Sequence, residues 1–212
     1  MSGAAQVVLS ACHRLVADGL IQGTSGNVSQ REGDGFVITP SGVPYDVITP
    51  QSMVHVGLDG VPQGGKPSSE WRMHRDIYAA RAEAGAVVHT HSPYATALSC
   101  LRADIPPFHY MIAIAGGSSL RCSDYALFGT QALSDAMLRA LEGRSACLLG
   151  NHGMICFGRD LADAMHRAAE VESLCQHYIL ACQMGAPTLL SEAEMAQVQA
   201  RFKTYGPDPT KG

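Results

Sequence analysis

The chain has 212 residues, of which 46% are hydrophobic and 16% charged, and it carries a formal net charge of −4. This size and apolar content predict a domain with a sizeable core and exclude a disordered chain. Neither nucleic acid nor membrane is an expected partner, because the sequence has no basic stripe and no run of about 20 apolar residues.

Hydrophobic periodicity predicts the elements of the N-terminal half. Apolar residues at helical spacing predict a first helix over residues 4–18, which Gly19 ends. Ser68 and Ser69 are favoured caps before the segment EWRMHRDIYAARAEA, which predicts a second helix. The remaining elements expected in this half are strands around 36–39, 53–58 and 86–91 and a helix from Pro93 through Leu101.

The C-terminal half is predicted to contain one more buried strand and two more helices. Ser145–Leu149 has the pattern of a buried strand, and residues 160–183 have that of a long amphipathic helix. A capping box at Ser191–Glu194 predicts the start of a last helix, and the tail at about 206–212 is expected to be flexible. Strands and helices alternate irregularly, which indicates an α/β class, and residues 1–212 are predicted to be a single domain.

Seven cysteines are present without any C-x-x-C motif, and most of them stand among apolar residues. We therefore expect reduced, buried thiols in a cytoplasmic protein. The segment MSGAAQVVLSACHRL lacks the charged n-region of a signal peptide and is expected to form a helix face instead.

The sharpest local motif is the pair His89-x-His91 in a predicted strand. Residues two apart in a strand project from the same face, so the two imidazoles can bind one transition metal. The alternative is that one histidine belongs to the core and the other to the surface.

Two further residues could complete a metal site. His152 follows the predicted strand that ends at Leu149, at the kind of position where α/β proteins place their sites. Glu70 begins the second predicted helix. By themselves these are also an ordinary turn histidine and a carboxylate that complements a helix N-terminus. Together with the histidine pair they would form a three-histidine, one-carboxylate set of the catalytic zinc type.

Three short loops are rich in small and hydroxyl residues. They span residues 23–27, 39–42 and 67–69. Such loops offer hydroxyls and accessible backbone N–H groups to an anion, and the third loop also precedes a helix, whose N-terminus favours phosphate. Each loop alone is also compatible with plain turn chemistry.

One nucleotide-binding motif is incomplete. Residues 60–66 fit the pattern G-x-x-x-x-G-K, but Pro67 stands where a P-loop needs Ser or Thr for magnesium. A nucleophilic serine is not expected either, since the pattern G-x-S-x-G is absent.

Eight segments spread nearly end to end carry a family resemblance: QGTSGNVS, ITPSGVPY, KPSSEWRMH, AVVHTHS, IPPFHYMIAIAGG, YALFGTQALSDA, NHGMICFG and RFKTYG. Together they resemble the class II (zinc-dependent) aldolase/adducin family, most closely its L-fuculose-1-phosphate branch. The resemblance implies a single three-layer domain with a central, mainly antiparallel sheet between helices. It also implies a homotetramer with its sites at subunit interfaces.

The resemblance also implies residue roles. Glu70 matches both a metal ligand and the general base, and Tyr110 matches a proton donor contributed by a neighbouring subunit. One Zn²⁺ per subunit, or another divalent metal, would be held by Glu70, His89, His91 and His152. The positions that match phosphate-binding residues are Gly26, Asn27, Ser41, Gly42, Ser68 and Ser69. Those that match the borders and aldehyde end of the substrate pocket are Thr24, Phe128 and Tyr205.

The implied activity is that of an aldehyde-lyase in carbohydrate metabolism. It would reversibly cleave a ketose 1-phosphate of the L-fuculose 1-phosphate type to dihydroxyacetone phosphate and an aldehyde such as lactaldehyde. The alternatives on the same scaffold are a 5-deoxyribulose or methylthioribulose 1-phosphate aldolase and a pentulose-phosphate 4-epimerase, which shares the segment HTHS. A noncatalytic module of the adducin type would be expected to have lost metal positions, whereas all four are intact here.

Overall fold

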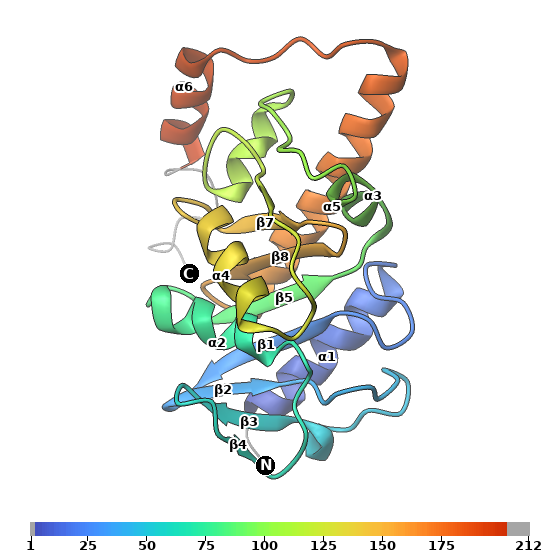
Figure 1. Ribbon diagram of the computed structural model, residues 1–212, viewed down its shortest axis with the longest axis vertical. Coiled ribbons are helices and arrows are strands. Elements are labelled where there is room, and N and C mark those ends of the chain that lie inside the picture. The colour runs from blue at the N-terminus through green and yellow to red at the C-terminus, as the bar shows by residue number, and fades with distance from the viewer. Residues whose placement is uncertain (1–2, 203–212) are drawn as a thin grey trace, which may run out of the picture.

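A central eight-stranded sheet organises residues 3–202, which are the residues that the computed structural model describes (Figure 1). The strand order is β4-β3-β2-β1-β5-β8-β7-β6, and only the β6–β7 pair is parallel. The strands are β1 (Asn27–Glu32), β2 (Gly35–Ile38), β3 (Val54–Gly57), β4 (Pro62–Gln63), β5 (Ala86–Thr90), β6 (Cys122–Ser123), β7 (Ala146–Leu149) and β8 (Gly153–Gly158).

Helices cover both faces of the sheet. They are α1 (Gly3–Ala17), α2 (Trp71–Ala80), α3 (Pro93–Ser99), α4 (Gln131–Ala140), α5 (Leu161–Met184) and α6 (Glu192–Phe202), with 3₁₀ turns η1 (Pro50–Ser52) and η2 (Tyr110–Ala115). One core cluster joins the sheet to α1, α3 and α5, and a second joins it to α2 and α4. The predicted three-layer α/β domain with a mainly antiparallel sheet is therefore confirmed. Within residues 3–202, no helix is both long and apolar enough to cross a membrane.

Strand β5 runs through the middle of the sheet and is buried along its whole length. Its side chains alternate between the two layers, so that Val88 packs in the cluster with α5 while Val87 packs in the cluster with α2. His89 is two residues beyond Val87 and therefore projects toward α2. The strand thus directs an imidazole at the helix that Glu70 precedes.

Within residues 3–202, five helices and strands were not predicted by the sequence patterns: β1, β4, β6, α4 and β8. Strand β1 has the sequence NVSQRE, whose polar residues hide the alternation of a half-buried strand. Asn27 and Ser29 are nevertheless buried, because they are hydrogen-bonded on the α2 side of the sheet. A pattern of hydrophobic residues therefore cannot predict a strand whose buried residues are polar and hydrogen-bonded.

The second helix is shorter than predicted. It ends at Ala80, because Arg81 is in an extended conformation and its guanidinium binds the carbonyls of Leu141 and Arg144. The last predicted helix begins as expected, with Ser191 and Glu194 exchanging cap hydrogen bonds. The flexible tail predicted at 206–212 lies outside the described residues.

Candidate active site

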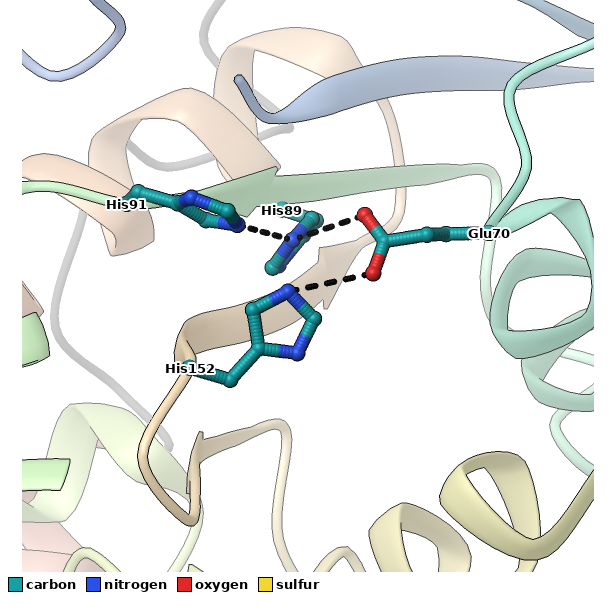
Figure 2. Close-up of side chains that lie close together, drawn as sticks. All are labelled: Glu70, His89, His91 and His152. Atoms are coloured by element: carbon teal, nitrogen blue, oxygen red, sulfur yellow. Dashed lines mark hydrogen bonds and ion pairs between the residues drawn. The ribbon is translucent and has the colours of Figure 1, made fainter. Parts of the chain in front are cut away.

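Four side chains from separate parts of the chain converge beside the middle of the sheet (Figure 2). Glu70 is the N-cap residue of α2, His89 lies near the end of β5, and His91 follows that strand. His152 lies in the turn between β7 and β8. Because β8 pairs with β5, with Ile155 opposite His89, this turn comes next to the end of β5. One ligand atom from each of the four residues lies within 4.8 Å of the others.

The polar atoms of these four side chains face one another at short distances. Glu70 Oε2 lies 3.1 Å from His89 Nε2, and Glu70 Oε1 lies 3.1 Å from His152 Nε2. His89 Nε2 is also 3.1 Å from His91 Nε2. The three imidazole rings meet edge-on, with ring centroids 4.7–4.9 Å apart. Three imidazole nitrogens and one carboxylate therefore point at one small volume.

This arrangement fits a divalent transition metal. Glu70 Oε1 is buried and faces only His152 Nε2, 3.1 Å away, among the described residues, so a cation would satisfy it. His89 Nδ1 donates to the carbonyl of Met154 at 2.8 Å, which leaves the Nε2 lone pair free to bind a metal. Imidazole nitrogens and carboxylate oxygens are common ligands of such metals. The described residues thus contain a metal-binding group, as the sequence predicted.

The protonation states of these side chains also suit metal binding. Burial opposes ionisation of Glu70, but the charge and hydrogen bonds of His89 and His152 outweigh burial and hold its pKa below the ordinary value. Burial and the neighbouring His89 and His152 lower the pKa of His91 to about 4. The carboxylate is therefore ionised, and His91 is neutral, as ligands must be.

A cavity of about 350 Å³ opens beside the four side chains. Its size suits a small sugar phosphate. It contains eight of the pocket positions expected from the resemblance, namely Thr24, Gly26, Asn27, Ser41, Gly42, Ser68, Ser69 and Phe128. It also contains Ser25 and Pro40, which belong to the predicted loops, and three residues that were not expected there, namely Tyr125, Ala126 and Asn151. Tyr110 is not among the lining residues, and Tyr205 lies outside the described part of the chain.

The three predicted loops come together on one side of this cavity. Ser68 N donates to Thr39 O at 3.0 Å, and Ser41 N donates to Lys66 O at 3.1 Å, which joins the second and third loops. Neither lysine nor arginine is among the residues that line the cavity. An anion there would be bound by hydroxyls, by backbone N–H groups and by the N-terminus of α2.

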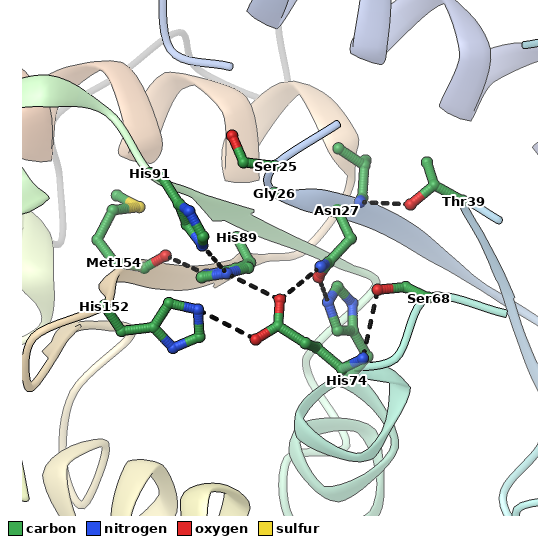
Figure 3. A network of polar contacts seen from close by, with 12 residues as sticks. Ser25, Gly26, Asn27, Thr39, Ser68, His74, His89, His91, His152 and Met154 are labelled. Atoms are coloured by element: carbon green, nitrogen blue, oxygen red, sulfur yellow. Dashed lines mark hydrogen bonds and ion pairs between the residues drawn. The ribbon is translucent and has the colours of Figure 1, made fainter. Parts of the chain in front are cut away.

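The side chain of Asn27 is turned away from this anion-binding role (Figure 3). Its amide nitrogen donates to Glu70 Oε2 at 3.0 Å, and its amide oxygen lies 2.5 Å from His74 Nε2. His74 was not among the site residues predicted from the sequence. Its position four residues after Glu70, on the same face of α2, is the signal that links it to the site.

Gly26 is expected to be essential to the geometry of the first loop, with its φ of +79° and with His89 O 2.7 Å from the position of a Cβ. Gly26→Ala should lower the free energy of unfolding by about 2–3 kcal/mol, since left-handed strain and a backbone clash add together. Gly33→Ala is the matched control, because Gly33 has φ +58° and open space around it. Urea denaturation of the two variants tests this, and equal losses would contradict the clash.

Comparison with known proteins assigns the chain to a family. The model of the class II aldolase and adducin N-terminal domain matches residues 6–179. A 5-methylthioribulose-1-phosphate/5-deoxyribulose-1-phosphate aldolase of Rhodospirillum rubrum is 48% identical over 200 residues, which are 94% of this chain and 90% of that protein. An L-fuculose phosphate aldolase of Escherichia coli (strain K12) is 45% identical, with 95% of each chain covered.

A solved structure agrees with these relatives. It is an L-fuculose 1-phosphate aldolase with a TM-score of 0.92 and 37% sequence identity, and the match covers 96% of this chain and 97% of that one. The relatives are aldolases, which are aldehyde-lyases, and they match over nearly the whole chain. The chain therefore belongs to the class II aldolase and adducin family.

Proposed function

We propose that this protein is a metal-dependent aldolase that reversibly cleaves a ketose 1-phosphate of the L-fuculose 1-phosphate type. The products would be dihydroxyacetone phosphate and an aldehyde such as lactaldehyde. The observation that carries the proposal is the convergence of Glu70 and three histidines beside a cavity rich in hydroxyls. The L-fuculose phosphate aldolases among the relatives support this substrate class.

Glu70, His89, His91 and His152 would hold one Zn²⁺ per subunit. When bound, the metal supplies Lewis-acid polarisation of the substrate's carbonyl and hydroxyl oxygens. The phosphate would lie against Gly26, Asn27, Ser41, Gly42, Ser68 and Ser69, with Thr24 at the border. Asn27 would contribute through its main chain, since its amide is engaged by Glu70 and His74. These contacts would fix the distance from the phosphate to the reacting carbon.

Glu70 would carry the proton at the reacting carbon. In cleavage, the C4 hydroxyl loses its proton, the C3–C4 bond breaks, and the aldehyde leaves. Glu70, which takes up one proton as the C4 hydroxyl loses one, then donates it to C3, and in the reverse reaction it removes that proton.

Tyr110 would exchange a proton with the C4 oxygen from a neighbouring subunit of a homotetramer. It lies at the start of η2, is 51% exposed and does not line the cavity of its own chain. A tetramer with sites at its interfaces would explain this separation. Phe128, which lines the cavity, and Tyr205 would contact the aldehyde end.

Because Tyr110 would act in the site of a neighbouring subunit, two inactive variants are predicted to complement each other. Glu70→Gln and Tyr110→Phe subunits should each be impaired as homotetramers. Mixed tetramers made by joint refolding should regain part of the activity, because some interfaces then combine an intact Glu70 with an intact Tyr110. Steady-state cleavage rates across mixing ratios measure this, and strictly additive rates would place Tyr110 in its own subunit's site.

A second candidate substrate is 5-methylthioribulose or 5-deoxyribulose 1-phosphate. The Rhodospirillum rubrum relative, at 48% identity, favours it. The mechanism would be unchanged, and only the group at the far end of the ketose would differ. A pentulose-phosphate 4-epimerase on the same scaffold would release no dihydroxyacetone phosphate.

One cleavage assay tests these alternatives. The purified protein is incubated with L-fuculose, 5-deoxyribulose and methylthioribulose 1-phosphates, with a chelator or with added zinc. Chelator-sensitive release of dihydroxyacetone phosphate is the expected result, and the highest kcat/KM identifies the substrate. Zinc-loaded protein that releases none from any ketose would overturn the aldolase proposal.

We also propose a cytoplasmic location. All seven cysteines are free, and five of them are buried or half-buried. Burial raises the pKa of Cys12 to about 12, so its thiol stays protonated and unreactive. Reduced thiols of this kind are usual in a reducing compartment.

A further inference from the structure

A row of buried polar side chains links the candidate metal site to the far end of α2. Glu70, His74 and Tyr78 follow one another at four-residue spacing and so share one face around α2. Asn27 and Ser29 are two apart in β1 and share the face of the sheet that looks toward this helix. The two series interdigitate, each strand residue lying between two helix residues.

The contacts form one unbroken chain. The successive distances are Tyr78 Oη to Ser29 Oγ 2.8 Å, Ser29 Oγ to His74 Nδ1 2.7 Å, His74 Nε2 to Asn27 Oδ1 2.5 Å, and Asn27 Nδ2 to Glu70 Oε2 3.0 Å. Each of the five side chains is at most 7% exposed. Figure 3 shows the inner part of this chain, with His74 behind Asn27 and away from the three metal-site histidines.

The hydrogen bond from the Asn27 amide to Glu70 sets the direction of the other hydrogen bonds in this chain of contacts. A carboxylate only accepts, so Asn27 turns its NH₂ toward Glu70 and its carbonyl oxygen toward His74. His74 must then carry its proton on Nε2.

The rest of the chain follows from that tautomer. His74 Nδ1 accepts from the Ser29 hydroxyl, whose oxygen accepts from Tyr78. Burial and the charge of His89 lower the pKa of His74 to about 3, and burial raises the pKa of Tyr78. Both side chains are therefore neutral, with one proton for each hydrogen bond.

We infer that His74 is a positioning residue, which uses its Nε2–H to hold the Asn27 amide in the orientation that aims Glu70 at the metal site. Ser29 and Tyr78 hold His74 in the required tautomer. This inference rests on the proposed function for its consequence in catalysis, but its structural content is independent of any substrate. An imidazole that merely filled the core would show no preferred tautomer or hydrogen-bond direction.

The first experiment reads the tautomer directly. Long-range ¹H–¹⁵N spectra are recorded on zinc-loaded, histidine-labelled protein between pH 6 and about 8, the range around the reference histidine pKa. The His74 signals are assigned by their loss in His74→Gln. A neutral ring protonated on Nε2 throughout the range is expected. A ring protonated on Nδ1, or on both nitrogens, would overturn the inference.

The second experiment compares His74→Gln with His74→Phe. Glutamine can offer an N–H near the position of Nε2, whereas phenylalanine matches the ring's shape but has no donor. Zinc affinity, measured by competition with a chromophoric chelator, should fall about 10–100-fold in His74→Phe, as for other outer-shell partners. His74→Gln should stay much closer to the wild type, with kcat/KM following the same order.

The ranking of the two variants by zinc affinity decides whether His74 acts by positioning Asn27 or only by packing. Zinc affinity in His74→Phe equal to or above that in His74→Gln would show that packing alone matters. His55→Gln and His55→Phe control for the substitutions themselves, because His55 is half-buried in β3 and outside the site. If His74→Phe does not fold, the tautomer still tests the inference. Wild-type protein that binds zinc but cleaves no ketose phosphate would refute the proposed function and leave both readouts valid.

Discussion

Glu70→Gln is expected to lower kcat for ketose 1-phosphate cleavage by about 10²–10⁴-fold, the contribution typical of a general acid–base group. The amide removes the group that carries the proton at C3 but keeps nearly the same shape. Its oxygen can still accept from Asn27 Nδ2, which lies 3.0 Å from Glu70 Oε2 in the wild type. The variant should therefore retain most of its zinc, so that loss of turnover is separated from loss of metal.

Two measurements on the same preparation test this. Zinc per subunit is measured by elemental analysis, and kcat is measured with the best substrate of the panel. Glu83→Gln serves as the control, because Glu83 is an exposed carboxylate beyond the end of α2 that pairs with Arg81. Normal turnover in Glu70→Gln would remove Glu70 from the proton transfer. An equal loss of zinc and activity would make Glu70 a ligand without a separate catalytic role.

His91→Ala is expected to lose bound metal and activity together. His91 supplies one of the four atoms of the group, and its removal takes away one of the bonds that would hold the cation. His91 lies beyond β5 and is half-buried, whereas His89 is completely buried. The alanine variant at His91 should therefore fold, which makes it the better test of the two.

Thermal unfolding gives a readout without substrate. A metal that binds only the folded protein stabilises it by about 2.7 kcal/mol at a free concentration of 100 Kd. Added zinc should raise the Tm of the wild type and of a His55→Ala control, and it should leave the Tm of His91→Ala nearly unchanged. Stoichiometric zinc retained by His91→Ala would refute its assignment as a ligand.

The sequence was most informative where one local pattern carried the signal. The segment AVVHTH predicted a strand that carries His89, although the strand ends one residue before His91. The small-residue loops that contain Ser41 and Ser68 were recognisable from composition. The three-layer class and the family followed from segments spread along the chain, and both are confirmed. Strand β1 was missed, because its buried face carries Asn27 and Ser29 in place of apolar residues.

Residue order thus determined most of the long elements, the histidine pair and the family, since each is recognisable from spacings of a few residues. Tertiary structure alone decided which way the side chains turn and which of them meet. It brought Glu70 and His152 to the end of β5, committed the Asn27 amide to Glu70 and His74, and left Tyr110 outside the cavity of its own chain. These outcomes depend on strand pairing and on the packing of α2 against the sheet. In such long-range contacts, a buried polar group is hydrogen-bonded to a partner from a distant segment, so one segment of sequence does not contain both partners.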